Sequence, residues 1–347
     1  MLNKNKKIRI AIVSKLWEET SPKSRGGTGS SIGLLVDELV ARGHQVTLFA
    51  TANSRTKAQK MISVRGSHYQ GDYSETHEYE NIANAFRRAD SFDIIHCAVE
   101  QKSVFFGDLV DTPSLHSIRY GEFFDHELKL LKNYRNLNYV TNSIALKKKL
   151  PFLNWQGVVH NGLNLDDFTR QEKAGDYLLY LDRLSPQKGI DLAIQAAIKT
   201  KKKLIIAGRI STTDAEFLEK KVYPFIDNKL IEYQGEVLGE KKKKLIAGAY
   251  CLLHPNSIFE ACSNTILESL ASNIPVIAFD RGSNSELIRN AETGFIVNNL
   301  SEMINSIKKI HKIDRSACSL SLQKTFSIGI MTDSYEDIYY SLINKNK

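Results

Sequence analysis

The sequence predicts an α/β protein with two domains, each a parallel sheet covered by helices. Two runs of alternating apolar strands and amphipathic helices lead to this prediction, one starting near residue 8 and the other near residue 177. The length agrees, because 347 residues are long for one core and sufficient for two domains of roughly 150 residues each. We place the domains at residues 1–168 and 169–325, followed by a tail at 326–347.

The first half opens with a βαβ unit. The apolar run 8–14 predicts a buried strand, a glycine-rich loop follows it, and residues 32–40 place their apolar side chains on one face of a helix. Gly43 should end that helix in a left-handed cap, and residues 45–50 return as a strand. Further strands are expected at 92–96, 113–115, 138–142 and 157–160.

The second half repeats the same alternation. Strands are expected at 177–182, 203–207, 230–234, 250–254 and 275–279. Helices are expected at 188–199, 213–224, 240–248, 265–272 and 301–311. The turn at Asn161-Gly162 and the polar stretch 166–176 mark the linker between the two halves.

The net charge of +8 is concentrated in short lysine runs, at 4–7, 147–149, 201–203 and 241–244. No nucleic-acid recognition module accompanies these runs, so no nucleic-acid partner is expected. The segment 146–155 differs, because its lysines adjoin Leu150, Phe152, Leu153 and Trp155. That mixture suits an anionic bilayer surface, while packing of the aromatic side chains into a core is the stronger alternative.

The expected location is the cytoplasm, with peripheral association at the inner face of the membrane as an option. The cysteines have neither paired nor metal-ligand spacing, which indicates reduced thiols; they are Cys97, Cys251, Cys262 and Cys318. No apolar run approaches the ~20 residues of a membrane helix. The apolar stretch after the basic residues 1–7 is short and lacks a cleavage site, so it predicts a first strand and not a signal peptide.

Two glutamates with seven residues between them, Glu260 and Glu268, are the most informative feature of the second half. Between them lies the helix-initiating cluster Ser263, Asn264 and Thr265, which would put two carboxylates beside free backbone N–H groups. Carboxylates bind hydroxyls and a helix N-terminus binds an anion, and a nucleotide sugar carries both kinds of group. The alternative is a capping box, in which Glu268 reaches back to the N–H of Thr265.

A second constellation contains Arg183 and Lys188. Pro186 interrupts any helix between them, so both should lie on the loop between a strand and the next helix. In an open parallel sheet such loops form the ligand crevice. The planar fork of an arginine and the mobile charge of a lysine suit a diphosphate, although cations on surface loops are usually only solvated.

Taken in order, these residues resemble the C-terminal half of a retaining glycosyltransferase of family four. The resemblance continues in 275–278, Gly282 and 292–295, and in the N-terminal motifs 25–29, 39–48, 92–96 and 159–164. It implies the GT-B architecture, two doubly wound, Rossmann-like domains that face a central cleft. The first domain would be on the acceptor side, the second would bind the nucleotide sugar, and the tail would be a helix that crosses back onto the first domain.

The resemblance also implies roles for residues of the second domain. Arg183 and Lys188 would hold the diphosphate and offset the charge of the leaving group. They would replace a metal, so neither a metal nor another cofactor is expected, and no Asp-x-Asp motif stands in a suitable setting. Glu268 would bind the ribose hydroxyls and Glu260 the donor sugar, and the N–H groups around 263–265 would meet sugar or phosphate oxygens.

In the first domain the resemblance points to a glycine loop and a histidine. Gly26 and Gly27 would lie against the donor phosphates, where glycine permits close approach of the backbone. A dinucleotide site is the weaker reading of this loop, because no acidic residue ends the second strand. His116 would lie near the transferred sugar, against the alternative of a structural histidine; His96 and His160 are expected to be structural.

The expected function is a retaining, metal-independent glycosyltransferase of the hexosyltransferase class, of the kind used in polysaccharide biosynthesis. It would move a hexose-type sugar from a UDP-sugar, with GDP-sugar second, to a glycan, lipid-linked or small-molecule acceptor. The alternatives are a nucleotide-sugar epimerase of GT-B fold and a non-catalytic subunit that binds a sugar nucleotide. The sequence departs from the family at 261–263, where Ala-Cys-Ser replaces the usual Pro-Phe-Gly, which puts the choice of sugar in doubt.

Overall fold

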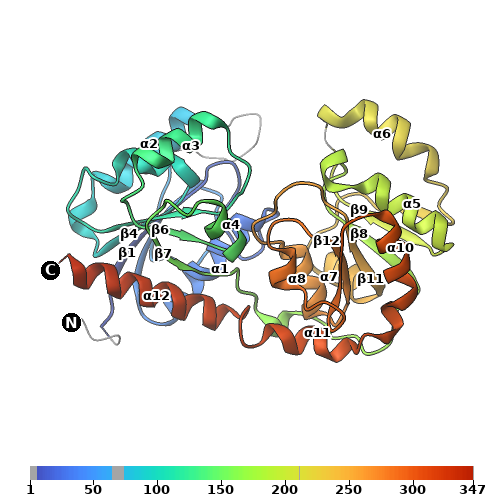
Figure 1. Ribbon diagram of the computed structural model, residues 1–347. Coiled ribbons are helices and arrows are strands. Elements are labelled where there is room, and N and C mark those ends of the chain that lie inside the picture. Colours follow the sequence, from blue (N-terminus) through green and yellow to red (C-terminus); the bar gives the residue numbers. More distant parts are fainter. Residues whose placement is uncertain (1–5, 65–73, 211, 347) are drawn as a thin grey trace. The chain divides into compact units, whose positions relative to one another are not determined.

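The computed structural model describes residues 6–64, 74–210 and 212–346, so part of the basic segment 1–7 lies outside the described residues. The chain divides into two compact units (Figure 1). Unit 1 comprises Met1–Leu163 and Phe326–Lys347, and unit 2 comprises Asn164–Thr325. The sequence places the corresponding limits at residues 168 and 325.

In its described residues, unit 1 is built on a seven-stranded parallel sheet of order β3-β2-β1-β4-β5-β6-β7. The strands are β1 (Arg9–Ser14), β2 (Gln45–Phe49), β3 (Lys60–Ile62), β4 (Ile94–Ala98), β5 (Ser114–Ile118), β6 (Tyr139–Thr141) and β7 (Trp155–Val158). The α-helices are α1 (Gly27–Ala41), α2 (Glu75–Phe86), α3 (Asp125–Asn133), α4 (Ile144–Lys149) and α12 (Ile328–Lys345).

Both faces of this sheet are covered, which explains why its strands are apolar throughout. One core joins β1, β2 and β4 to α1 and α12, and a second core joins the opposite side chains of the same strands to α2. A strand that is buried on both faces needs a continuous apolar run, and residues 10–13 provide one. The helix α1 ends before Gly43, which adopts a φ of 89° as the sequence predicts.

The C-terminal helix α12 packs against the sheet of unit 1 (Figure 1). Its buried side chains recur at helical spacing, as at Met331, Tyr335 and Tyr339. The hydroxyl of Tyr339 lies 2.7 Å from Nδ1 of His96 in β4. The tail is therefore an integral part of the first hydrophobic core.

Within the described residues, unit 2 is a six-stranded parallel sheet of order β10-β9-β8-β11-β12-β13. The strands are β8 (Tyr177–Leu181), β9 (Leu204–Ala207), β10 (Ile231–Tyr233), β11 (Ala249–His254), β12 (Val276–Phe279) and β13 (Gly294–Val297). The helices are α5 (Ile190–Thr200), α6 (Ala215–Lys221), α7 (Gly239–Ala247), α8 (Asn264–Ala271), α9 (Asn284–Leu287), α10 (Leu300–Lys309) and α11 (Arg315–Leu322).

Each sheet has one place where the strand order reverses. In unit 1 it lies between β1 and β4, and in unit 2 between β8 and β11. The connections from these two strands leave in opposite directions, so a crevice forms outside their carboxyl ends, and doubly wound proteins bind ligands there. The prediction of two doubly wound parallel sheets is confirmed. A ligand site is expected at these two switch points.

The predicted elements differ from the observed ones in a few places. The strands expected at 92–96 and 157–160 are displaced by two residues at both ends, and the strand expected at 113–115 ends three residues later in the structure. The elements that were not expected include β3, β13 and α11. None of the helices in the described part of the chain is long and apolar enough to cross a bilayer.

Candidate functional site

The loop that leaves β8 at the switch point of unit 2 carries Arg183 and Lys188, as the sequence predicts. The buried Tyr180 holds this loop, because its hydroxyl donates to the backbone oxygens of Arg183 (2.9 Å) and Lys188 (3.3 Å). Gly189 then turns the chain into α5 with a φ of 69°, and a Cβ at this position would lie 2.2 Å from the oxygen of Pro255. The backbone of the loop is thus fixed against the segment that follows β11.

Glu260 lies in the loop that follows β11, next to the β8 loop, and one of its carboxylate oxygens accepts three hydrogen bonds. Oε2 accepts from Nζ of Lys188 at 3.0 Å, from Nε2 of His254 at 3.1 Å and from Nδ2 of Asn256 at 3.2 Å. No described residue donates to Oε1, and the side chain is 20% exposed. One oxygen of Glu260 is therefore held by the protein while the other remains available to a ligand.

The backbone around Glu260 is fixed as well. The N–H of Ser283 donates to the carbonyl of Glu260 at 2.9 Å. Gly282 adopts a φ of 58°, and a Cβ there would lie 2.1 Å from that same carbonyl oxygen. A glycine is needed at position 282 because the backbone of Glu260 passes this close to it.

Lys188 lies between two carboxylates. Its Nζ is 2.9 Å from Oδ2 of Asp182 and 3.0 Å from Oε2 of Glu260, and its side chain is only 13% exposed. Ligand atoms of Asp182, His254 and Glu260 lie within 4.8 Å of one another, which is the spacing of a metal site. In this structure the cation between the two carboxylates is the ammonium group of Lys188.

These contacts set the protonation of the cluster. Burial by itself would raise the pKa of Glu260, but the positive charges of His254 and Lys188 and their hydrogen bonds outweigh it, so the pKa is lowered. Burial would lower the pKa of Lys188, but the charges of Glu260 and Asp182 outweigh it, so the pKa is raised. Glu260 is thus a carboxylate and Lys188 an ammonium ion around neutral pH.

Arg183 is half-buried on the same loop, and Asp182 accepts a hydrogen bond from its backbone N–H at 2.7 Å. The Nε of its guanidinium group is buried and donates to no described residue. A buried donor without a partner costs free energy, so a ligand acceptor at this place would be stabilising. The two cations of the loop therefore differ, because Lys188 is neutralised by the protein and Arg183 lacks such a partner.

The helix after Glu260, α8, does not begin with the capping box considered as the alternative. Ser263 is the N-cap of α8, and its side chain accepts from the N–H of Ile266. Glu268 therefore lies in the second turn, not the first, and the alternative of a capping box with Thr265 is wrong. Instead, Oε2 of Glu268 forms an ion pair with Nζ of Lys242 in α7 at 2.5 Å.

The N-terminus of α8 lies directly after Glu260, so the predicted cluster Ser263, Asn264 and Thr265 does open this helix. The first backbone N–H groups of a helix have no acceptor within the helix, and the macrodipole favours an anion there. The sequence analysis missed Asp182, His254 and Asn256 as parts of the site. Their positions at the carboxyl ends of β8 and β11 were the available signal.

In unit 1 the glycine loop lies at the N-terminus of α1. Gly26 is the N-cap of this helix and Gly27 its first residue. The carboxylate of Glu18 occupies this place, since its Oε1 accepts from the N–H of Gly29 at 3.0 Å. A Cβ on Gly26 would lie 1.3 Å from Oε2 of Glu18, so the glycine makes room for a carboxylate of the chain itself.

His116 lies inside β5, whereas the strand expected at 113–115 would have ended just before it. It is fully buried, with Nδ1 2.8 Å from Oγ of Ser103 and Nε2 2.9 Å from Oγ of Ser114. Burial lowers the pKa of His116 to about 3. Both ring nitrogens are bonded within unit 1, and this is the pattern of a structural histidine.

His96 in β4 has the same pattern. Its Nε2 lies 2.7 Å from Oγ of Ser117, its Nδ1 is bonded to Tyr339, and its side chain is fully buried. Burial, together with the charge of Arg119, lowers the pKa of His96 to about 3. The expectation that this residue is structural agrees with these contacts.

The switch point of unit 1 carries a charged cluster that the sequence analysis did not identify. Glu100 follows β4 and is 7% exposed, although its backbone has a φ of 57°. Its Oε1 lies 2.7 Å from Nζ of Lys15, and its Oε2 accepts from the N–H of Arg119 at 2.8 Å. A buried glutamate in the left-handed region is unfavourable and is typical of functional places.

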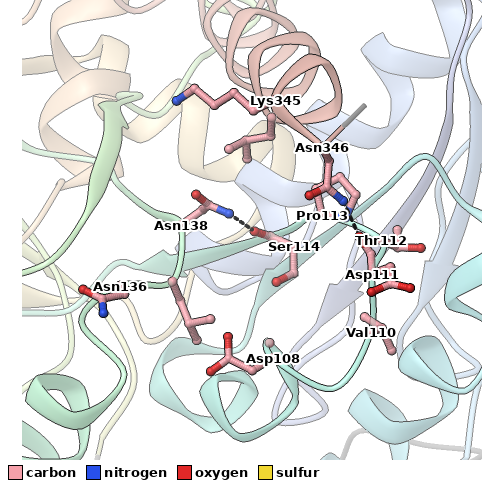
Figure 2. A pocket seen from close by; sticks show the side chains of 13 residues that line it. Asp108, Val110, Asp111, Thr112, Pro113, Ser114, Asn136, Asn138, Lys345 and Asn346 are labelled. Atoms are coloured by element: carbon pink, nitrogen blue, oxygen red, sulfur yellow. Dashed lines mark hydrogen bonds between the residues drawn. The ribbon is translucent and has the colours of Figure 1, made fainter.

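A cavity of about 260 Å³ lies at the amino ends of the strands of the unit 1 sheet, where β5 begins. Figure 2 shows polar side chains around it, and Asn138 donates to the backbone oxygen of Ser114 at 3.1 Å. Asn346, just after α12, donates to the backbone oxygen of Asp111. None of the predicted site residues lines this cavity.

The segment 146–155, considered above as a membrane surface, directs most of its apolar side chains inward. Leu150 and Leu153 are buried, and Nε1 of Trp155 donates to the oxygen of Leu150 at 2.8 Å. Phe152 is half-buried, and Nζ of Lys132 lies 5.8 Å from its ring centre. These contacts favour the alternative of core packing.

Residues 165–318 match the family model of glycosyl transferases group 1. No curated protein matches the chain in sequence. The solved structures that resemble it include HepE of Anabaena in complex with UDP and glucose, with 16% identity, a TM-score of 0.77, and 96% of this chain and 100% of that chain covered. They also include a sucrose-phosphate synthase from Thermosynechococcus elongatus, with 17% identity, a TM-score of 0.80, and coverage of 97% and 99%.

A glycosyltransferase from Rickettsia africae is similar too, with 18% identity, a TM-score of 0.75, and 98% of this chain and 100% of that chain covered. At these identities the likeness shows the fold, which is that of GT-B glycosyltransferases. The group 1 domain and this fold together support a transferase enzyme. The resemblance to family four in particular stays a prediction.

Proposed function

We propose that the protein transfers a hexose-type sugar from a UDP-sugar to a hydroxyl of a glycan, lipid-linked or small-molecule acceptor. The anomeric configuration would be retained and no metal would be required. The observation that supports this most is Glu260, whose Oε2 is held by three donors, one of them the cation Lys188, while Oε1 is available. A carboxylate acceptor for sugar hydroxyls thus adjoins one positive charge for a diphosphate, and Arg183 on the same loop would supply a second.

In the reaction, the bond between the anomeric carbon and the diphosphate oxygen breaks, and a bond from that carbon to the acceptor oxygen forms. The electron pair of the broken bond stays on the diphosphate, and the proton of the acceptor hydroxyl goes to a phosphate oxygen on the same face. Negative charge therefore grows on the leaving phosphate, and Arg183 and Lys188 would stabilise it. Lys188 has three donors, of which two are used by Asp182 and Glu260.

The absence of a metal requirement is part of the proposal. Asp182, His254 and Glu260 have the spacing of metal ligands, and a fit between them and a divalent ion would require Lys188 to leave. Because the ammonium group of Lys188 already lies between both carboxylates, we expect the wild-type chain to keep its own cation in preference to an added one.

UDP is preferred over GDP because the solved HepE structures hold UDP, UDP with glucose, and UDP-glucose. Glu268 would bind the ribose hydroxyls, and the N–H groups that open α8 would bind sugar or phosphate oxygens. Gly26 and Gly27 would admit a phosphate if the carboxylate of Glu18 moved away. His116 has no part in this mechanism, and association with a membrane and a role in polysaccharide biosynthesis stay predictions.

The test is the thermal stability of the protein with UDP-sugars and GDP-sugars, each with and without EDTA. A ligand at 100 times its Kd should stabilise the fold by about 2.7 kcal/mol, equally in both conditions. Arg183→Gln should lower turnover by about 10²-fold, while the matched control Arg289→Gln, on the surface of unit 2, should not. Stabilisation by no nucleotide sugar, or only with a divalent metal, would contradict the proposal.

Product analysis with the donor alone separates this proposal from a nucleotide-sugar epimerase. A transferase without acceptor releases free sugar and UDP slowly, by transfer to water. An epimerase would instead return a second nucleotide sugar or hydrolyse the donor rapidly. The configuration of the released sugar, followed by NMR, tests retention.

A further inference from the structure

We propose that His254 is a positioning residue for Glu260, which holds Oε2 of the carboxylate so that Oε1 faces a hydroxyl of the donor sugar. This inference rests on the proposed function, because it assigns a further residue to the same site. His254 is the last residue of β11, directly at the switch point of unit 2. A rigid strand thus fixes the donor that orients the loop carboxylate.

The surroundings of His254 leave little freedom to its ring. The side chain is 3% exposed, and Nε2 lies 3.1 Å from Oε2 of Glu260. The partner is a carboxylate, which only accepts, so Nε2 must carry the proton of this hydrogen bond. The bond therefore fixes the orientation of the His254 ring as well as the position of Glu260.

The other two donors to Glu260 have further partners. Lys188 also pairs with Asp182, and in the proposed reaction its third N–H group binds the diphosphate. Asn256 divides its amide N–H groups between Glu260 and the oxygen of Ile258, and its own oxygen accepts from Asn284 at 3.0 Å. In the described residues, the Nε2 of His254 has Glu260 as its one hydrogen-bond partner. Among the three donors to Glu260, His254 is thus the one whose hydrogen bond serves Glu260 alone, while Lys188 and Asn256 each serve a second partner.

The experiment compares His254→Phe, which keeps a ring but removes the donor, with His254→Gln, whose amide N–H can reach the place of Nε2. The probes are UDP and UDP-glucose, or the UDP-sugar that stabilises the protein most. Affinity for UDP should stay within about twofold of wild type, because UDP has no sugar. The rate of UDP release from the UDP-sugar should fall about 10- to 100-fold in His254→Phe and recover largely in His254→Gln, as expected for a hydrogen bond to a charged group.

A double-mutant cycle shows whether His254 acts through Glu260. In a Glu260→Gln background, His254→Phe should cost little further turnover, because the carboxylate that it positions is gone. If His254→Phe does not fold, His254→Gln and His254→Asn carry the same test, since the shorter Asn does not reach Glu260. Leu252→Val, at a buried place on the same strand, is the control for a general loss of packing in β11.

The outcomes separate the two proposals. A wild-type protein that neither binds nor cleaves any UDP-sugar would overturn the proposed function, and the role of His254 with it. If the wild type is active, three results would each overturn the role of His254 alone. The first is unchanged turnover in His254→Phe. The second is a loss of affinity for UDP in His254→Phe that is as large as its loss of turnover. The third is an effect of His254→Phe on turnover that adds fully to that of Glu260→Gln.

Discussion

Replacement of Lys188 by methionine removes the one cation between two carboxylates and keeps most of the apolar stem. In the wild type, Nζ is 2.9 Å from Asp182 and 3.0 Å from Glu260. The three side chains are only 13%, 19% and 20% exposed, so water can compensate only in part for the lost charge. The variant should therefore be destabilised in unit 2.

The magnitude follows from the partners that remain. Removal of one partner from a buried ion pair costs about 3–5 kcal/mol. Here Glu260 keeps its bonds to His254 and Asn256, and Asp182 keeps the N–H of Arg183. We therefore expect a loss near the lower limit, about 3 kcal/mol in the free energy of unfolding at pH 7.5.

The sign of the pH dependence can be worked out from Glu260. Its pKa is lowered in the folded wild type, in part by Lys188, so the stabilisation is present above the unfolded value and is lost as the pH falls through the folded one. The variant loses part of this stabilisation. The difference in the free energy of unfolding between wild type and variant should thus be largest at neutral pH. It should shrink below about pH 4.3, the ordinary pKa of glutamate.

The assay should follow unit 2 separately. Both tryptophans, Trp17 and Trp155, lie in unit 1, so their fluorescence reports that unit and provides an internal control. Hydrogen exchange of peptides from β8 and β11 reports unit 2. The exposed Lys199→Met is the matched control and should change the stability by less than about 0.5 kcal/mol. A Lys188→Met protein with wild-type exchange in β8 and β11 would refute the placement of Nζ between the carboxylates.

Three further predictions follow from the same structure. Zn²⁺ or Mn²⁺ should raise the melting temperature of the Lys188→Met variant but not of wild type, because the vacated cluster has the spacing of metal ligands; equal effects on both proteins would contradict this. Glu268→Gln should weaken UDP binding about tenfold, measured by calorimetry, while Lys242→Met should leave UDP binding nearly unchanged. If the ion pair between Glu268 and Lys242 is purely structural, the two variants should instead have equal effects on UDP binding. Burial lowers the pKa of His96 and His116 to about 3, so the unfolded chain takes up protons below pH 6.5 that the folded one does not. The stability of unit 1 should thus fall by as much as about 2.7 kcal/mol per pH unit between pH 6 and 4, and tryptophan-monitored urea unfolding that shows no such slope would contradict the burial of these rings.

Prediction from the sequence succeeded where a local pattern is sufficient. The apolar runs 10–13 and 177–181 are long enough to identify strands that are buried on both faces. It failed for β3 (Lys60–Ile62), which has three residues at the edge of its sheet with exposed or half-buried side chains, and for β13, which begins at Gly294. Short strands of this kind owe their existence to a neighbouring strand, and a single sequence does not show that neighbour.

The start of α8 shows a second limit. Ser263, Asn264 and Thr265 are all good N-cap residues, and the alternative of a capping box placed the cap at Thr265. In the structure Ser263 is the cap, so Glu268 moves into the second turn and meets Lys242 instead of a backbone N–H. A shift of two residues rotates a helical side chain by about 200°, and this decides its partner.

The sequence by itself determined that this protein has two parallel sheets covered by helices. It also determined that Arg183, Lys188 and Glu260 lie in loops that follow strands. It did so because burial on both faces requires apolar runs, and because proline and glycine end the helices between them. Only the tertiary structure decided that Lys188 forms ion pairs with both Asp182 and Glu260, and that His254 holds one oxygen of that glutamate. Lys188 and Glu260 are 72 positions apart, and their distance depends on the order of β8 and β11 in the sheet. Strand order is a property of the assembled core, so no local pattern around either residue contains it.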